Sequence, residues 1–64
     1  MCIDIVNTLR YLEPGDRIHF VIPKRSLDDC IGLLNKVARL VMVEDLKDGR
    51  VYIVVEKGRN DTLK

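Results

Sequence analysis

The length of the chain, 64 residues, is its most restrictive feature. A chain of this size forms one domain with a thin core, and it buries only about 60% of the surface that its unfolded form exposes. Hydrophobic residues make up 47% of the sequence and charged residues 33%, which is typical of a globular domain rather than of a disordered or collagen-like chain. We therefore expect one small folded domain that gains stability from a partner, in the simplest case a second copy of itself.

The charges are almost balanced, because eleven Lys and Arg oppose ten Asp and Glu for a net charge of +1. Nucleic-acid and membrane-surface binders normally have a clear basic excess, so this balance argues against both partners. No apolar stretch is long enough to span a membrane, and the first residues lack the basic segment and apolar run of a secretory signal. With two cysteines and no such signal, we expect a reduced protein in the cytoplasm.

The first half of the chain changes from helical to strand periodicity. Residues 2–12 have the apolar spacing of one helical stripe, which consists of Cys2, Ile5, Val6, Leu9 and Leu12. Pro14 and Gly15 end this helix in a turn. Residues 17–22 then alternate, which predicts a half-buried strand: Ile18, Phe20 and Ile22 share one face, and Arg17, His19 and Val21 the other.

The second half predicts a helix followed by a hairpin. Ser26, three residues before Asp29, resembles a capping box and predicts a helix from Leu27 to about Arg39. Its apolar stripe consists of Leu27, Cys30, Ile31, Leu34, Val37 and Ala38. Residues 40–44 and 51–56 are rich in β-branched side chains, and the Asp-Gly dipeptide between them predicts an antiparallel turn. Residues 59–64 form a polar C-terminal tail outside a single domain of residues 1–58.

This order of elements, α-β-α-β-β, predicts an α/β two-layer sandwich. A right-handed strand-helix-strand crossover places both helices on one face of a small three-stranded mixed sheet. The other face would carry Arg17, His19 and Val21, together with alternate hairpin residues such as Met42, Tyr52 and Val54. No element remains to cover this face. We therefore expect the protein to self-associate through the sheet and through the edge strand from Arg17 to Ile22.

The turn motifs of the chain fall at spacings that resemble a known family. Leu12-Glu13-Pro14-Gly15-Asp16, the hairpin Asp48-Gly49 and the closing Lys57-Gly58 resemble the TusA/SirA group of small sulfur-carrier proteins over about residues 5–58. Members of that group begin with a strand and a Cys-Pro-x-Pro motif whose thiol carries a persulfide, and this chain lacks the strand and both prolines. Cys2 lies about one helical turn beyond the position of that thiol, on the same helix face.

This resemblance implies a divergent sulfur-carrier or sulfur-transfer accessory protein that uses Cys2, in enzymatic terms at most a sulfur-relay carrier. It implies sulfur-relay proteins as partners and no cofactor. The chain also resembles, more weakly, the Alba group of archaeal nucleic-acid-binding proteins in its order of elements. Glu44, Asp45 and Asp48 make its hairpin acidic, however, where the Alba hairpin is basic. Three hypotheses remain: sulfur transfer, a non-catalytic dimeric interaction module, and an Alba-like nucleic-acid binder.

The two cysteines are the main candidates for chemistry. A thiol at a helix N-terminus, as predicted for Cys2, has its pKa lowered by the helix dipole and reacts as a thiolate. The alternative is that Cys2 packs as a small apolar residue, as we expect for Cys30. The N-termini of both helices should lie at one end of the sheet, so the two cysteines are also candidates for a redox pair. As a carrier thiol near a free end, Cys2 should be replaceable by Ser with little loss of stability.

Other polar residues give weaker signals. Lys24 and Arg25 precede a predicted helix N-terminus and are candidates for an anion site, although a solvated loop is the alternative. Asp28 and Asp29 suit the positive end of the second helix dipole and predict helix stabilisation rather than acid-base catalysis. His19 has no cysteine or second histidine at metal-ligand spacing, so we expect a surface side chain and no metal site.

Overall fold

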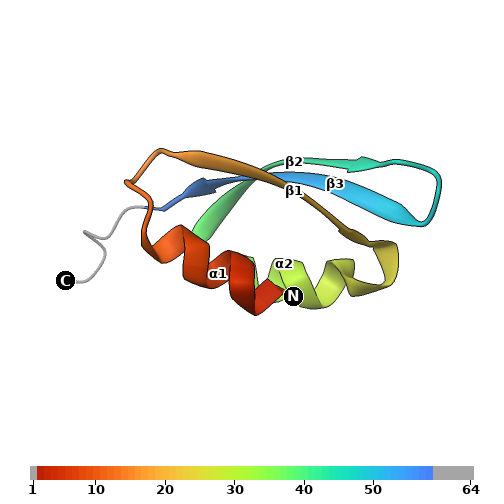
Figure 1. The fold of residues 1–64 in the computed structure, drawn as a ribbon, viewed down its shortest axis with the longest axis horizontal. Helices are drawn as coiled ribbons and strands as arrows, with labels where there is room; N and C mark the ends of the chain where they lie inside the picture. The colour runs from red at the N-terminus through yellow and green to blue at the C-terminus, as the bar shows by residue number, and fades with distance from the viewer. Residues whose placement is uncertain (1, 59–64) are drawn as a thin grey trace.

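The computed structural model describes residues 2–58, so the predicted polar tail lies outside the described residues. In chain order its elements are α1 (Cys2–Arg10), β1 (Arg17–Pro23), the short 3-10 turn η1 (Lys24–Ser26), α2 (Leu27–Leu34), β2 (Ala38–Asp45) and β3 (Arg50–Lys57). Both helices lie on one side of the sheet, as Figure 1 shows, which confirms the two-layer α/β sandwich. Among residues 2–58 there is no helix with the length and apolar character needed to cross a membrane.

The sheet is antiparallel throughout, where the sequence had suggested a mixed sheet. Its strand order is β1-β3-β2, and β3 pairs antiparallel with both neighbours. The strands β1 and β2, which α2 connects, run parallel to each other, but β3 lies between them and prevents a parallel ladder. Val54 on β3 faces His19 on one side and Met42 on the other. A register shift between Leu40 and Met42 interrupts the outer edge strand β2.

Both helices end earlier than their apolar stripes predict. After Leu34 the amides of Asn35, Lys36 and Val37 still bond back to the last turn, and the strand β2 begins at Ala38. Val37 thus packs against the core from a turn and Ala38 from the start of β2, and the carbonyl of Val37 accepts a bond from the Gly58 amide at 3.1 Å. The predicted cap at Ser26 is also absent, because the chain enters α2 from η1 with helical backbone angles.

The hydrophobic core lies between the helix pair and the inner face of the sheet. It consists of Val6, Leu9, Ile22, Cys30, Leu34, Val51, Ile53 and Val55. The central strand β3 supplies three of these residues at alternate positions, and each of the three is at most 1% exposed. A fully buried side chain of this kind contributes about 1.5–3 kcal/mol, so β3 is the strand around which the layers pack.

One lysine continues this inner face. Lys57 is only 9% exposed, and its Nζ donates to the Leu9 carbonyl oxygen at 2.7 Å. Its own backbone amide donates to the Asp16 carbonyl at 2.7 Å, and its carbonyl accepts from the Gly15 amide at 3.1 Å. Gly15 has a φ of 95°, which a side-chain-bearing residue rarely adopts. Lys57 therefore ties both the end of α1 and the following turn to β3.

Candidate functional site

The structure brings the two cysteines together. Cys2, the first residue of α1, and Cys30 in α2 form a disulfide bond, with their Cα atoms 5.5 Å apart. Cys30 has no exposed surface, whereas Cys2 is half-buried. The prediction that Cys30 belongs to the core is confirmed, and the redox pair that the sequence left as an alternative is present. The expectation of a free Cys2 thiol in a reduced protein is not met, because both cysteines of the chain are in this bond.

The sheet surface opposite the helices is the second candidate site. We call it the helix-free face; cross-strand register and alternation assign to it Arg17, His19 and Val21 of β1, Tyr52, Val54 and Glu56 of β3, and Arg39, Met42 and Glu44 of β2. No described element covers it (Figure 1). The sequence correctly placed the three β1 members, Tyr52, Val54 and Met42 on a shared surface, because a strand presents every second side chain to the same side.

The centre of the helix-free face is apolar. Val21 is 44% exposed and Met42 is 41% exposed, while Val54 between their strands is only 6% exposed. The ring nitrogen Nδ1 of His19 and the hydroxyl of Tyr52 share a hydrogen bond, and the two rings lie 5.8 Å apart between centroids. His19 is exposed, as predicted, but it is paired rather than free in solvent. The polar side chains of His19 and Tyr52, which lie next to Val54 and Val21, therefore bond to each other.

Charged side chains occupy the two ends of the helix-free face. At one end Glu56 Oε1 accepts hydrogen bonds from Arg17 Nε and from Arg39 Nη2, both at 3.1 Å. These bonds, that of Arg17 first, lower the pKa of Glu56 below its ordinary value of 4.5. Two guanidinium groups thus share one carboxylate. Sequence reasoning missed this cluster, although strand alternation already puts the three positions on one surface.

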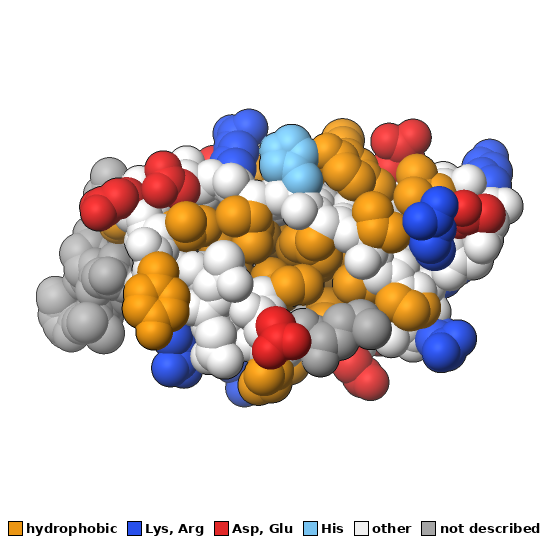
Figure 2. Space-filling view, viewed as in Figure 1, with side chains coloured by type: hydrophobic (Ala, Val, Ile, Leu, Met, Phe, Trp, Pro, Cys, Tyr) orange, Lys and Arg blue, Asp and Glu red, His pale blue; other side chains and the backbone are white. Residues whose placement is uncertain are grey.

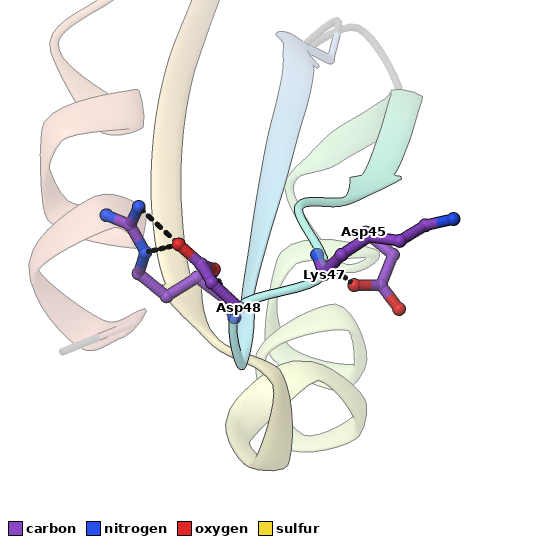
Figure 3. Close-up of polar contacts among 4 residues, drawn as sticks. Asp45, Lys47 and Asp48 are labelled. Atoms are coloured by element: carbon purple, nitrogen blue, oxygen red, sulfur yellow. Dashed lines mark hydrogen bonds and ion pairs between the residues drawn. The ribbon is translucent and has the colours of Figure 1, made fainter.

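The hairpin end of the helix-free face presents the carboxylate of Glu44, where the other end presents two guanidinium groups. Glu44, opposite Tyr52 in the register, makes no ion pair with any residue between 2 and 58. Arg50 also belongs to this end by alternation, but its guanidinium is held by Asp48 Oδ2 at 2.7 Å, as Figure 3 shows. The same bond is the first cause that lowers the pKa of Asp48. On the helix-free face this end therefore carries the carboxylate of Glu44, which has no ion-pair partner among residues 2–58.

The predicted anion site at Lys24 and Arg25 has a carboxylate within it. Lys24 Nζ lies 2.8 Å from Asp45 Oδ2, and this contact raises the pKa of Lys24 and lowers that of Asp45. The other oxygen of Asp45 accepts from the Lys47 amide at 2.8 Å in the hairpin (Figure 3). Arg25 is exposed in the three-residue turn η1. Lys24 thus links η1 to the hairpin. An anion bound here would have to displace the Asp45 carboxylate from the Lys24 ammonium.

Hydrophobic side chains gather over the middle of the molecule in Figure 2, and most of the acidic and basic groups lie around its margin.

Comparison with protein-family models, curated proteins and solved structures finds no match for this chain. The resemblance to the sulfur-carrier and Alba groups therefore stays a prediction. The geometry of the cysteine pair and of the helix-free face is the basis for a functional proposal.

Proposed function

We propose that the protein is a non-catalytic interaction module that forms a homodimer through its helix-free face. The observation that supports this proposal is the pair of exposed apolar side chains, Val21 on β1 and Met42 on β2, which lie on one face of an uncovered sheet with Val54 of β3 between their strands. Stacking a second sheet on this surface removes these side chains from water. Sheets stacked in this way lie about 10 Å apart, with interdigitated side chains.

The distribution of charge favours a second copy as the partner. A two-fold axis that lies in the interface, perpendicular to the strands, places each end of one helix-free face against the opposite end of the other. Arg17 and Arg39, which share a single carboxylate, then approach the unpaired Glu44 of the second copy. The contact is made twice by symmetry. Val54 lies near the axis, so the apolar centres of the two copies also meet.

Pairing of strand edges is the competing arrangement. Both β1 and β2 are edge strands, and an exposed edge can add a strand from another chain. The register shift between Leu40 and Met42 blunts the β2 edge, whereas β1 runs from Arg17 to Pro23 without a register shift. Edge pairing through β1 would leave Met42 in solvent. Face stacking covers Met42 and Val21 together, and we propose it for this reason.

Two neighbouring residues of β2 allow a matched test. Met42 is 41% exposed on the helix-free face, and Val43 is 39% exposed on the opposite face. We expect sedimentation equilibrium at micromolar concentration to give a dimer for the wild type and for Val43→Glu, and a monomer for Met42→Glu. A wild-type monomer, or equal behaviour of the two variants, would contradict dimerisation through this face. Circular dichroism of both variants controls for loss of folding.

Sulfur transfer by Cys2 is a second candidate function. The observation that favours it is the position of Cys2, half-buried at the start of α1, where the helix dipole stabilises a thiolate once the bond to Cys30 is reduced. The Cys2 thiolate of the reduced protein should then attack the outer sulfur of a donor persulfide, which forms a persulfide on Cys2 and releases the donor as a thiolate. Mass spectrometry should find one added sulfur on the wild type and on Cys30→Ser, but not on Cys2→Ser. Absence of the added sulfur in all three would exclude this function.

A further inference from the structure

The two cysteines of the disulfide differ in their exposure to solvent. Cys30 is completely buried in the core, whereas Cys2 is the first residue of α1 and keeps part of its surface exposed. Exchange of a disulfide begins when a thiolate attacks one of its two sulfurs, and access decides which of them is attacked. A thiol from solution therefore reaches the sulfur of Cys2, and the sulfur of Cys30 is the leaving group.

The helix α1 is held to the rest of the domain by a different bond at each end. The disulfide holds its first residue to α2, and the Lys57 ammonium binds the Leu9 carbonyl near its last residue. Between these two bonds only Val6 and Leu9 are buried. A helix of nine residues is too short to be stable alone, so its order depends on these contacts.

From this arrangement we propose that the Cys2–Cys30 disulfide is a reaction site for small-molecule thiols, and that its reduction loosens the first turns of α1 while the last turn stays docked. This site is separate from the helix-free face. The buried part of α2 around Cys30 lies beneath the released segment, so reduction uncovers an apolar surface that the oxidised protein hides. The fold thereby contains a redox-dependent change confined to one half of one helix.

The exchange balances without any further reagent. A thiolate RS⁻ attacks the sulfur of Cys2, the bond between Cys2 and Cys30 breaks, and Cys30 leaves as a thiolate that takes up a proton. The product is a mixed disulfide between R and Cys2. A second thiolate attacks the R sulfur of this mixed disulfide, which releases RSSR and leaves Cys2 as a free thiol. Two thiols are oxidised to one disulfide, and the protein receives the two electrons.

Glutathione is a suitable probe, because it is a small thiol whose mixed disulfide with a cysteine adds a mass that identifies the modified residue. Wild-type protein is incubated without denaturant in mixtures of reduced and oxidised glutathione, quenched by alkylation and analysed by mass spectrometry and amide hydrogen exchange. We expect reduction under native conditions, with faster exchange at Val6 and Asn7, whose amides bond to the carbonyls of the first turn of α1, and unchanged exchange in β3. Reduction that occurs only when β3 amides also exchange would show that the bond opens by global unfolding, and would overturn the proposal.

Single-cysteine variants test which sulfur is attacked. With oxidised glutathione, Cys2 in the Cys30→Ser variant should form the mixed disulfide roughly tenfold faster than Cys30 in the Cys2→Ser variant, since reaction requires access. Equal rates, or a faster reaction at Cys30, would contradict attack at Cys2. If either variant fails to fold, the site of the mixed disulfide trapped in the wild type decides the same question, because a trapped adduct on Cys30 is incompatible with the proposal.

Discussion

Removing the disulfide should cost this domain a large share of its stability. The two cysteines are 28 residues apart in the sequence, so their bond closes a loop of that length. In the chain-entropy model, a loop of 28 residues restricts the unfolded chain by about 12 cal/mol/K, which is about 3.6 kcal/mol at 25 °C. A domain of 64 residues has a total stability of only about 3–10 kcal/mol. Loss of the bond therefore removes a third or more of it.

The assay is urea denaturation of wild type and of a Cys2→Ala/Cys30→Ala double variant, followed by far-UV circular dichroism. We expect the free energy of unfolding to fall by about 3–5 kcal/mol, since the alanine at position 30 also leaves a small void in the core. Fully reduced wild type should lose slightly less than the double variant. The control is Tyr11→Ser, because Tyr11 is 88% exposed and should change stability by less than about 0.5 kcal/mol.

This prediction reverses the sequence-based expectation that Cys2→Ser leaves the fold nearly as stable. A loss below about 1 kcal/mol for the double variant would show that the bond to Cys30 does not constrain the chain. The argument for a disulfide between α1 and α2, and the thiol reaction proposed for it, would then be refuted together.

Three further substitutions have definite expected effects. Lys57→Met keeps the buried stem but removes the charged hydrogen bond to the Leu9 carbonyl, which then keeps only the Leu12 amide as its donor, and it should lower the free energy of unfolding by about 1.5–3 kcal/mol in urea denaturation. The pKa of Glu56 is lowered in the folded state, so its ionised form adds stability above pH 4.5, and this stability is lost as the pH falls through the folded pKa. Urea titrations across this range should show that acidification lowers the free energy of unfolding less for Glu56→Gln than for the wild type. Gly32→Ala meets no atom within 4 Å in α2 and should raise the melting temperature, with a gain of about 0.5–1 kcal/mol, and a lower melting temperature would contradict an open helical position.

The local periodicity of the sequence was sufficient to predict the helices and strands, but not the residues at which they end. The alternation of residues 17–22 and 51–56 and the Asp48-Gly49 turn predicted β1, β3 and the hairpin because these signals act over a few residues. Val37 and Ala38 continue the helical stripe of α2, so spacing alone extended that helix to Arg39. Instead Val37 lies in a turn, where its carbonyl accepts a bond from Gly58, which is remote in sequence, and the chain continues as β2 from Ala38.

The long-range features depend on how the elements pack, which local spacing does not contain. The position of β3 between β1 and β2 determines that the sheet is antiparallel and brings Arg17 and Arg39 to the same carboxylate. The reasoning that helix N-termini share one end of the sheet placed Cys2 near Cys30, but it left the bond itself open. Lys57 occupies a position on the buried face of β3. Its role in holding α1 can be seen only once the end of α1 is known to lie beside it.

Isotope-filtered nuclear Overhauser measurements on a mixture of labelled and unlabelled wild-type chains test dimerisation through the helix-free face most directly, because they require no substitution. Stacked sheets about 10 Å apart bring interdigitated side chains into contact. We predict intermolecular contacts from the methyl groups of Val54, Val21 and Met42, and none from Val43 on the opposite face. Intermolecular contacts that involve Val43, or none from Val54 and Met42, would contradict the proposed interface.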